Sequence, residues 1–265
     1  MRSINKVKLF SNNTENSKTI EKELIKLLNE YNFEISDDFE LGIAIGGDGA
    51  FLQMVKQTNF NSNPYYIGIN TGTLGFLQEI KPDKIEEFIK SLNENNYKFD
   101  EIGVLETLIT TENENKKYYS LNELVIRDLF LNVFKSEIYV DKVKLENFAG
   151  DGLLIATSVG SSAYNMSLNG ALVYNTLHTI QINPISPLNT SAYRNLLNPI
   201  ILPQESLVEI IPQKRNVAIM CDGEIKKIED VSKIECSVKD KKLKFLRMKE
   251  YEFINIVNEK FIEEK

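Results

Sequence analysis

The chain has 265 residues, and its 42% hydrophobic and 26% charged residues are typical of a globular protein with one large domain or two smaller ones. A formal net charge of −7, without a dense run of Lys or Arg, argues against a nucleic-acid binder. The two cysteines, Cys221 and Cys236, have neither a metal-binding spacing nor the pattern of a disulfide framework. No segment resembles a signal peptide or approaches the ~20 apolar residues that cross a bilayer. We therefore expect a cytoplasmic protein with no membrane partner and with both thiols buried and reduced.

The first hundred residues predict strands alternating with helices. Short apolar segments typical of strands occupy 7–10, 41–45 and 65–69. Residues at helical spacing follow each of them, and Pro82 stands where the first turn of the third helix is expected. The apolar faces expected for the first and third helices are Ile20, Leu24, Leu27 and Leu28, and Ile85, Phe88, Ile89 and Leu92. This order predicts a Rossmann-like parallel sheet.

A glycine-rich turn, GGDG at residues 46–49, directly follows the second expected strand. Glycine turns between a parallel strand and a helix bind phosphate through backbone N–H groups, so Gly46, Gly47 and Gly49 are candidate phosphate-binding residues. Asp48 adds a carboxylate, which predicts contact with a cation or hydroxyl, or acceptance of a proton. The alternative is a tight turn in which Asp48 only caps the helix. A second glycine turn, NTGTLG at 70–75, follows the third strand and is expected at the same sheet edge.

From about residue 101 the helical spacing fades, and β-branched and aromatic residues alternate with polar ones. Asp222-Gly223 is a hairpin signal, and 183–203, with four prolines, is expected to be an ordered loop. The expected strands are 104–111, 117–127, 136–146, 151–157, 206–211, 216–221, 224–228 and 233–238, which is the spacing of a β-sandwich. We therefore predict an α/β domain at 1–100 and a β-sandwich domain at 101–245. A helical tail at 246–265 is expected to pack back on the first domain.

The β domain carries a second group of candidate residues. Gly150-Asp151-Gly152 precedes an apolar strand, and Gly160 opens a segment of small and hydroxylated residues. Small side chains leave room for a flat ring or a ribose, and hydroxyl groups bind polyols. Asn122-Glu123 begins another apolar strand, where both side chains can bind hydroxyls. Taken singly, a Gly/Ser cluster is more often an ordinary loop, and a pair such as Asn122-Glu123 is usually a solvated strand edge.

Taken together and in order, GGDG, NTGTLGFL, NE and GDGLLIATSVGSSAYNMS resemble the NAD kinase family over roughly residues 40–225. The GGDG turn is shared with lipid kinases of the diacylglycerol and sphingosine type and with phosphofructokinases. The LGFL element, the NE pair and the GDG…AYN…S block point to NAD kinases specifically.

The resemblance implies Mg²⁺-dependent phosphoryl transfer from ATP, or from polyphosphate, to the 2′-hydroxyl of the adenosine ribose of NAD. Asp48 is implied as the catalytic residue, with Asn122 and Glu123 on the adenosine half of NAD and Asp151 on the nicotinamide half. The sequence shows no protein cage for a metal, so Mg²⁺ is expected mainly on the donor phosphates. A homo-oligomer, a dimer or tetramer, is also implied. The implied NAD-binding residues are Asp48, Gly49, Asn122, Glu123, Asp151, Ser162, Ala163, Tyr164 and Ser167.

Two other functions compete with this interpretation. A lipid kinase shares the GGDG turn, but it is expected to carry a basic or apolar membrane-facing surface that this acidic chain does not show. A nucleotide sensor that has lost the chemistry is favoured by departures from the usual family pattern: Ala50 replaces a hydroxyl residue, and Ser158-Val159 replace a proline and a hydroxyl residue. It is disfavoured by the retained Asp48, Asn122, Glu123 and Asp151.

Overall fold

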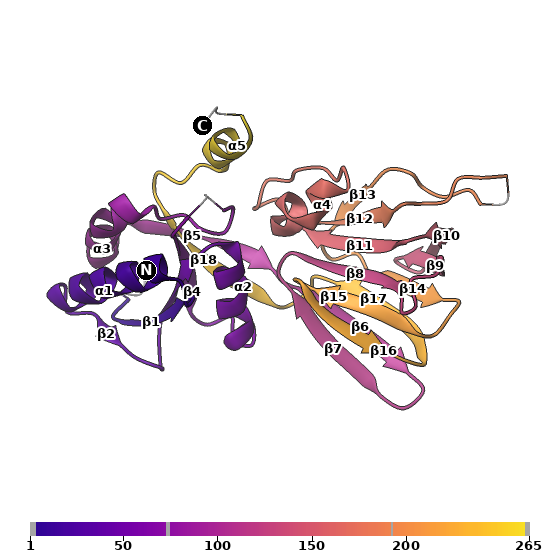
Figure 1. Ribbon diagram of the computed structural model, residues 1–265, viewed down its shortest axis with the longest axis horizontal. Coiled ribbons are helices and arrows are strands. Elements are labelled where there is room, and N and C mark those ends of the chain that lie inside the picture. Colours follow the sequence, from indigo (N-terminus) through magenta and orange to yellow (C-terminus); the bar gives the residue numbers. More distant parts are fainter. Residues whose placement is uncertain (1–3, 73–74, 192, 263–265) are drawn as a thin grey trace. The chain divides into compact units, whose positions relative to one another are not determined.

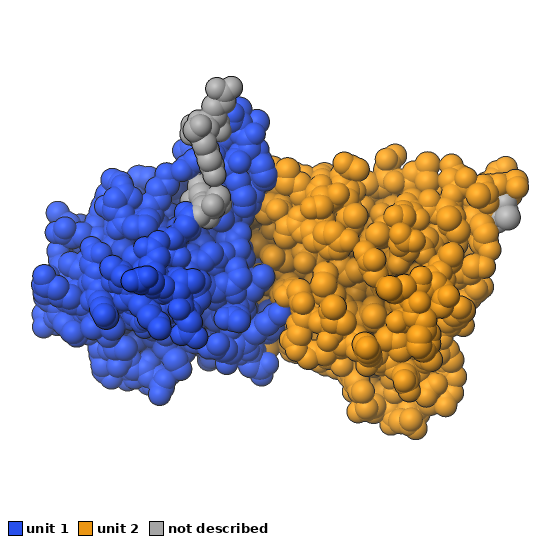
Figure 2. Space-filling view, in the orientation of Figure 1, with its two compact units in different colours: residues 1–102, 242–265 blue, residues 103–241 orange. Residues whose placement is uncertain are grey.

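The computed structural model describes residues 4–72, 75–191 and 193–262, and its helices and strands are shown in Figure 1. The chain divides into two compact units (Figure 2). Residues 1–102 and 242–265 form the α/β unit, and residues 103–241 form the β unit. No helix within the described ranges has both the length and the apolar character needed to cross a membrane.

The α/β unit is built on a six-stranded sheet in the order β2-β1-β3-β4-β18-β5. The pairs from β2 through β18 are parallel, as the alternation of strands and helices predicts. β3 and β4 are almost completely buried, which explains their continuous apolar sequences. The strands are β1 (Lys6–Ser11), β2 (Glu34–Ile35), β3 (Leu41–Gly46), β4 (Tyr65–Asn70), β5 (Tyr97–Gly103) and β18 (Lys242–Met248).

The helices of the α/β unit bury the apolar faces that the sequence predicts. Thr14 caps the first helix by accepting a hydrogen bond from the backbone N–H of Ser17, and the expected face of this helix is buried except at the partly exposed Leu27. All four residues expected on the face of α3 are buried. The helices are α1 (Glu15–Glu30), α2 (Asp48–Gln57), α3 (Ile85–Asn93), preceded by the 3-10 turn η1 (Pro82–Lys84), and α5 (Phe253–Phe261).

The return of the chain to the α/β unit begins with a strand that the sequence did not predict. β18 enters the parallel sheet beside β4, and α5 then follows as the expected helix of the tail (Figure 1). The sequence of β18, KLKFLRM, alternates polar and apolar residues only over its first four positions, because Phe245 and Leu246 are adjacent and Arg247 is buried. This alternation is too short to predict a strand, and it does not indicate which sheet the segment joins.

Arg247 on β18 fixes this returning segment through a buried ionic cluster. Its guanidinium donates from Nη1 to Glu79 Oε2 at 3.1 Å and from Nε to Asp100 Oδ2 at 2.9 Å. Its Cζ lies 3.9 Å from the ring centroid of Tyr251. The Arg247 side chain is only 3% exposed, so the two carboxylates compensate for the burial of its charge.

The β unit is a sandwich of two antiparallel six-stranded sheets, ordered β10-β9-β14-β17-β6-β7 and β13-β12-β11-β8-β15-β16. Its main apolar core contains side chains from both sheets, including Ile109 and Ile234 from the first and Ile126 and Ile155 from the second. The strands are β6 (Leu105–Thr111), β7 (Asn115–Ser120), β8 (Glu123–Asp128), β9 (Phe134–Val140), β10 (Val143–Gly150), β11 (Gly152–Thr157), β12 (Thr179–Ile185), β13 (Ile200–Pro203), β14 (Val208–Pro212), β15 (Val217–Cys221), β16 (Glu224–Ile228) and β17 (Val231–Ser237).

Two of the expected strands were wrong because each is two strands. The segment 117–127 contains the end of β7 in one sheet and nearly all of β8 in the other, and the chain changes sheet at Leu121-Asn122. The segment 136–146 contains a hairpin turn at Asp141-Lys142, where both residues have positive φ (+49° and +70°). Glycine usually marks such turns, and this one has none.

The proline-rich segment is also only partly a loop, because β12 and β13 occupy its two ends. Pro184 lies within β12, although proline lacks the N–H group that a central strand needs. The pairing of β12 with β13 ends at Ile182, so Pro184 lies beyond the part of β12 that has a neighbour on both sides. The four prolines of this segment predicted a loop over its whole length. That prediction is wrong at the two ends, and at Pro184 the strand is possible because its pairing is only partial.

We predict that Arg247→Met lowers the free energy of unfolding by about 3–5 kcal/mol, because it leaves two carboxylates buried without their cation. Urea denaturation measures this change. Lys242→Met is the matched control on the same strand, since the ion pair from Lys242 to Glu101 is largely exposed and is expected to contribute less than about 1 kcal/mol. Equal losses from the two variants would contradict the role assigned to Arg247.

Candidate functional site

Asp48 is the first residue of α2, immediately after the carboxyl end of β3. Gly47 is the N-cap, and no side chain among the described residues caps this helix. A carboxylate in the first turn is stabilised by the positive end of the helix dipole. Where a Cβ would stand on Gly47 or Gly49, no described atom lies within 4 Å, so the turn is open there. These features suit the approach of a phosphate to the backbone.

The carboxylate of Asp48 is held by the segment that follows the second glycine turn. The backbone N–H groups of Phe76 and Leu77 donate to Asp48 Oδ2 and Oδ1, each at 3.0 Å. The buried Gln78 donates from Nε2 to the carbonyl oxygen of Gly47 at 2.7 Å. Three hydrogen bonds therefore join the two turns, and they fix the orientation of Asp48. The sequence did not single out Gln78, since a glutamine after an apolar tetrapeptide carries no motif signal.

Gly75 makes this arrangement possible by its lack of a side chain. A Cβ on Gly75 would lie 1.9 Å from Asp48 Oδ1, far inside van der Waals contact. The backbone that carries the two N–H donors can approach the carboxylate only because residue 75 is glycine. The expected turn at 70–75 also includes Thr73 and Leu74, which lie outside the described residues.

The side chain of Phe76 is packed under the C-terminal helix. Its ring centroid lies 6.0 Å from that of Phe253 and 5.5 Å from that of Phe261. The Lys260 ammonium lies 4.4 Å from the same centroid. The N–H of Phe76 binds Asp48 while its ring binds α5, so residues near the end of the chain help to order the turn around Asp48.

A groove adjoins the first turn of α2 on the other side. Asn12, Lys18, Ala50 and Gln53 are among the residues that line it. They come from the β1–α1 turn, from α1 and from α2. The groove thus places amide and ammonium groups, together with the carboxylate of Glu21, beside the first turn of α2. The amide and ammonium groups are of the kind that bind phosphate oxygens.

In the β unit, Asn122 and Glu123 lie where the chain passes from β7 in one sheet to β8 in the other. They are 8% and 5% exposed, so the sequence-based alternative of a solvated strand edge is wrong. Thr157 on β11 binds this backbone twice, donating from Oγ1 to the Leu121 carbonyl at 2.6 Å and from N–H to the Asn122 carbonyl at 2.9 Å. A Cβ on Gly160 would lie 1.9 Å from the Asn122 carbonyl oxygen. The backbone before Glu123 is therefore tightly packed on this side.

Residues 158–170 fold over the outer face of the sheet that contains β8. This segment contains the 3-10 helix η2 (Val159–Ser162) and the short helix α4 (Tyr164–Ser167). Tyr164 packs on a small cluster that includes Val125 of β8 and Leu154 of β11, and its hydroxyl accepts a hydrogen bond from Arg127 Nη2 at 3.0 Å. Arg127 was not predicted as a site residue, and a lone arginine at a strand end gave no signal.

Asn165 orders this segment from within. It is fully buried, donating from Nδ2 to the Ser161 carbonyl at 3.3 Å and accepting from Asn183 Nδ2 at 3.1 Å. The neighbouring Ser162, Ala163 and Tyr164 are partly exposed, and Ser167 is exposed. The buried Asn165 thus supports the segment 158–170, while the four predicted NAD-binding residues of this segment remain accessible.

Asp151 lies between β10 and β11, at the opposite end of β11 from the Asn122–Glu123 pair. Ala156 of β11 is paired with Glu123, and Asp151 is five residues earlier, about 17 Å at the usual rise of a strand. Asp151 is exposed, and its N–H donates to the Ile185 carbonyl at 2.9 Å. The β unit thus presents Glu123, Tyr164 and Asp151 along one strand pair.

The predicted residues accordingly fall into two groups. Gly46, Gly47, Asp48 and Gly49 lie together in the α/β unit. The second group lies in the β unit and contains Asn122, Glu123, Asp151, Ser162, Ala163, Tyr164 and Ser167. Both cysteines are buried and neither forms a disulfide, and burial raises the pKa of Cys236 to about 12, so it remains a thiol at neutral pH.

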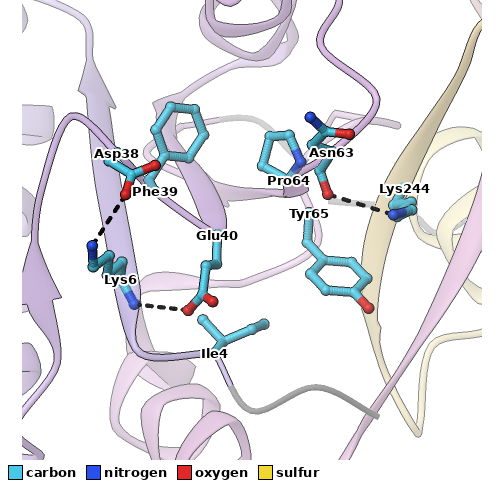
Figure 3. Close-up of a pocket in the computed structure, with 9 residues that line it drawn as sticks. All are labelled: Ile4, Lys6, Asp38, Phe39, Glu40, Asn63, Pro64, Tyr65 and Lys244. Carbon is cyan, nitrogen blue, oxygen red and sulfur yellow. Dashed lines mark hydrogen bonds and ion pairs between the residues drawn. The ribbon is translucent and has the colours of Figure 1, made fainter.

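Another pocket in the α/β unit lies at the amino ends of the parallel strands (Figure 3). Its charged groups already have partners: Lys6 Nζ binds Asp38 at 3.1 Å, and the N–H groups of Asn5 and Lys6 donate to Glu40. Asp48 follows the carboxyl end of β3, at the other edge of the sheet. This pocket is therefore separate from the turn around Asp48, and ligands of open α/β sheets bind at the carboxyl edge.

Comparison with known proteins gives one consistent result. The chain matches the family model described as ATP-NAD kinase N-terminal domain over residues 1–97, and that described as ATP-NAD kinase C-terminal domain over residues 121–248. An NAD kinase of Finegoldia magna is 34% identical over 262 residues, covering 94% of this chain and 95% of that protein. An NAD kinase of Leuconostoc mesenteroides is 31% identical over 265 residues, covering 98% and 99% of the two chains.

Two solved structures share the fold. Yeast NADH kinase, crystallised with NADH, superposes with a TM-score of 0.85 at 20% identity, covering all of this chain and 90% of that one. An NAD kinase from Archaeoglobus fulgidus, in complex with ATP, superposes with a TM-score of 0.79 at 22% identity, covering 96% and 98% of the two chains. The expected α/β domain followed by a β-sandwich is thereby confirmed.

We predict that Gly75→Ala lowers the free energy of unfolding by about 2 kcal/mol, because the added methyl group separates the two N–H donors from the Asp48 carboxylate. Amide hydrogen exchange at Phe76 and Leu77 should become faster. Gly72→Ala in the same turn is the control, because no described atom lies within 4 Å of its Cβ position and neither glycine has a positive φ. Unchanged exchange at both amides in Gly75→Ala would contradict the proposed contact.

Proposed function

Because the chain belongs to the ATP-NAD kinase family, we propose that it transfers the γ-phosphoryl group of ATP to the 2′-hydroxyl of the adenosine ribose of NAD, giving NADP and ADP. One observation carries the assignment of roles: a half-buried carboxylate, Asp48, is fixed beside an open glycine turn by two backbone N–H groups. A fixed hydrogen-bond acceptor beside a phosphate-binding turn is what transfer to a hydroxyl requires.

Asp48 acts on the acceptor hydroxyl. Each of its oxygens accepts one N–H bond and keeps a lone pair for the 2′-hydroxyl. As the hydroxyl oxygen forms its bond to the γ-phosphorus, the bond to the β–γ bridging oxygen breaks, and the hydroxyl proton passes to Asp48. A weak base suffices, because in a loose transition state the hydroxyl loses its proton late.

The donor phosphates bind the N–H groups of Gly46, Gly47 and Gly49 at the start of α2. The adjoining groove adds the ammonium group of Lys18. These groups recognise phosphate oxygens rather than a base, so inorganic polyphosphate is a second donor to test beside ATP.

ATP enters as its magnesium complex. Within the described residues no three His, Cys, Asp or Glu side chains gather into a metal-binding group, so the donor phosphates supply most of the ligands. When bound, the ion offsets the negative charge of the transferred group.

The acceptor NAD uses the second group of residues. Asn122 and Glu123 bind the hydroxyls and base of the adenosine half, and Asp151 binds the nicotinamide half. The separation of about 17 Å along β11 suits an extended dinucleotide. Tyr164, positioned by Arg127, lies along the same strand pair and offers a ring face and a hydroxyl. Gly49, Ser162, Ala163 and Ser167 complete the proposed set.

We further propose a homo-oligomer, a dimer or a tetramer, in the cytoplasm. The β unit exposes large apolar side chains on β10, on β14 and before β9: Val143, Ile211, Phe130, Leu131 and Val133. Exposed apolar groups of this kind favour association, which sedimentation velocity measures. Two buried cysteines that form no disulfide support a reducing compartment.

We predict that Asp48→Asn lowers kcat for NADP formation by at least about a hundredfold, because the amide cannot accept the proton. An NADP-specific coupled dehydrogenase assay, with ATP or polyphosphate as donor, measures turnover. The dissociation constant of NAD, measured by calorimetry, should change by less than about threefold, since the side chain keeps its size.

Asp38→Asn is the control for this experiment. Its carboxylate is 92% exposed, pairs with Lys6 and lies at the opposite edge of the same sheet, so kcat should stay within about twofold of wild type. If folded wild-type protein binds NAD but makes no NADP with either donor, the protein is a sensor and the proposed reaction is wrong.

We also predict that excess EDTA abolishes turnover and that added Mg²⁺ restores it, because the donor charge must be offset. Binding of NAD alone should persist in EDTA, since the Asn122–Glu123 region holds its substrate without a metal. Turnover that continues in EDTA would exclude a divalent cation from the reaction.

A further inference from the structure

Asp222 lies in the tight turn between β15 and β16, where the sequence indicates a hairpin and leaves contact with the pocket as the alternative. Its side chain does not point to solvent, and the residue is 9% exposed. Asp222 Oδ2 accepts the N–H of Leu121 at 2.7 Å, and Oδ1 accepts those of Asn122 at 2.8 Å and Glu123 at 3.2 Å. One carboxylate therefore binds three successive backbone N–H groups, which include those of both proposed adenosine-binding residues.

Successive N–H groups that converge on one point form an anion-binding concavity, which often holds a phosphate. Here the anion is a side chain of the protein. The N–H of Asp222 also donates to the Glu123 carbonyl at 3.2 Å, which ties the turn to β8. Its φ of +45° is a conformation that aspartate adopts more readily than most residues. The turn thus places a negative charge directly under the Asn122–Glu123 backbone.

The opposite side of this backbone is held by neutral groups. Thr157 binds the carbonyl oxygens of Leu121 and Asn122, and Gly160 packs against the Asn122 carbonyl. Carbonyl oxygens are therefore fixed from β11, and N–H groups are fixed from the β15–β16 turn. Among these described contacts, only the Asp222 carboxylate satisfies all three N–H groups at once.

We propose that Asp222 is a positioning residue for NAD: by holding the N–H groups of residues 121–123, it directs the side chains of Asn122 and Glu123 toward the adenosine half. The proposal rests on the function proposed above. Because the carboxylate fills the concavity, it also excludes the phosphate groups of ATP and NAD from this point. The site around Asn122 and Glu123 then accepts the neutral adenosine rather than the pyrophosphate.

The other end of β8 provides a matched control. Asp128 is 2% exposed, and its Oδ1 accepts the N–H groups of Phe130 and Asn132 at 2.9 and 3.1 Å and Nδ2 of Asn132 at 2.9 Å. Asp128 holds the backbone that follows β8, as Asp222 holds the backbone at the start of β8, but the residues that Asp128 orders are not proposed to contact NAD. Comparing substitutions of the two aspartates therefore distinguishes the effect of destabilising a turn from the effect of misplacing the NAD-binding side chains.

The experiment compares Asp222→Ala, Asp222→Asn and Asp128→Ala in the full chain, by NADP formation, by calorimetric binding of NAD and by thermal unfolding. Asp222→Ala should raise both KM and Kd for NAD by about tenfold or more, with a smaller change in kcat. Asp222→Asn should have an intermediate effect, because one acceptor oxygen remains. Asp128→Ala should lower the melting temperature to a similar degree and leave KM and Kd for NAD within about twofold of wild type.

Rescue of KM for NAD by sodium formate distinguishes a positioning role of Asp222 from a purely structural one. A small carboxylate can enter the concavity left by Asp222→Ala, so formate should lower KM for NAD in that variant and not in Asp128→Ala. If Asp222→Ala does not fold, KM and Kd for NAD are compared between Asp222→Asn and Asp128→Ala instead.

Unchanged KM and Kd in both Asp222 variants, or equal rises in Asp222→Ala and Asp128→Ala, would overturn the proposal. If wild-type protein binds NAD but makes no NADP, the proposed reaction fails, and the calorimetric comparison still tests Asp222.

Discussion

The bonding of an aspartate carboxylate to backbone N–H groups from a distant segment is the interaction on which both parts of the candidate site depend. In the α/β unit, Asp48 accepts N–H groups from residues 28 and 29 positions later. In the β unit, Asp222 accepts N–H groups from residues about 100 positions earlier. A charged acceptor strengthens each bond and leaves buried N–H groups satisfied. Each carboxylate therefore fixes a loop that no regular secondary structure would hold.

The fold supplies the places where such bonds are needed. Asp48 lies at the carboxyl edge of a parallel sheet, where the strand-to-helix turn leaves the backbone open. Asn122 and Glu123 lie where the chain leaves one sheet of the sandwich and enters the other, so their backbone cannot be part of a continuous ladder. Where the backbone is irregular, at a sheet edge or a change of sheet, its N–H and C=O groups are not all paired within a sheet or helix. In this protein such groups bind side chains and hold them in defined directions.

The C-terminal segment also helps to hold the turn around Asp48. β18 completes the parallel sheet through the buried Arg247, and α5 packs on Phe76, whose N–H binds Asp48. The sequence predicted a helix returning to the first domain, and the helix is present. It did not predict β18, because the alternation of polar and apolar residues in this segment is short and is interrupted at Phe245-Leu246. Nor did it predict Gln78, Arg127 or the bonds of Asp222, since each acts through contacts with residues far away in the chain.

By itself, the sequence determined the alternation of three strands and three helices in the first hundred residues, without β2 and β5, and the β-rich second half. It also determined the family and the identity of Asp48, Asn122, Glu123 and Asp151 as candidates. These follow from local signals: periodicity, glycine turns and the resemblance of ordered motifs. Only the tertiary structure decided that Leu121-Asn122 is a change of sheet, that Gly75 must lack a side chain, and that Asp222 serves the NE pair. The physical reason is that strand pairing, close approach and carboxylate–backbone bonds join residues whose separation in sequence, up to about a hundred positions, leaves no local pattern.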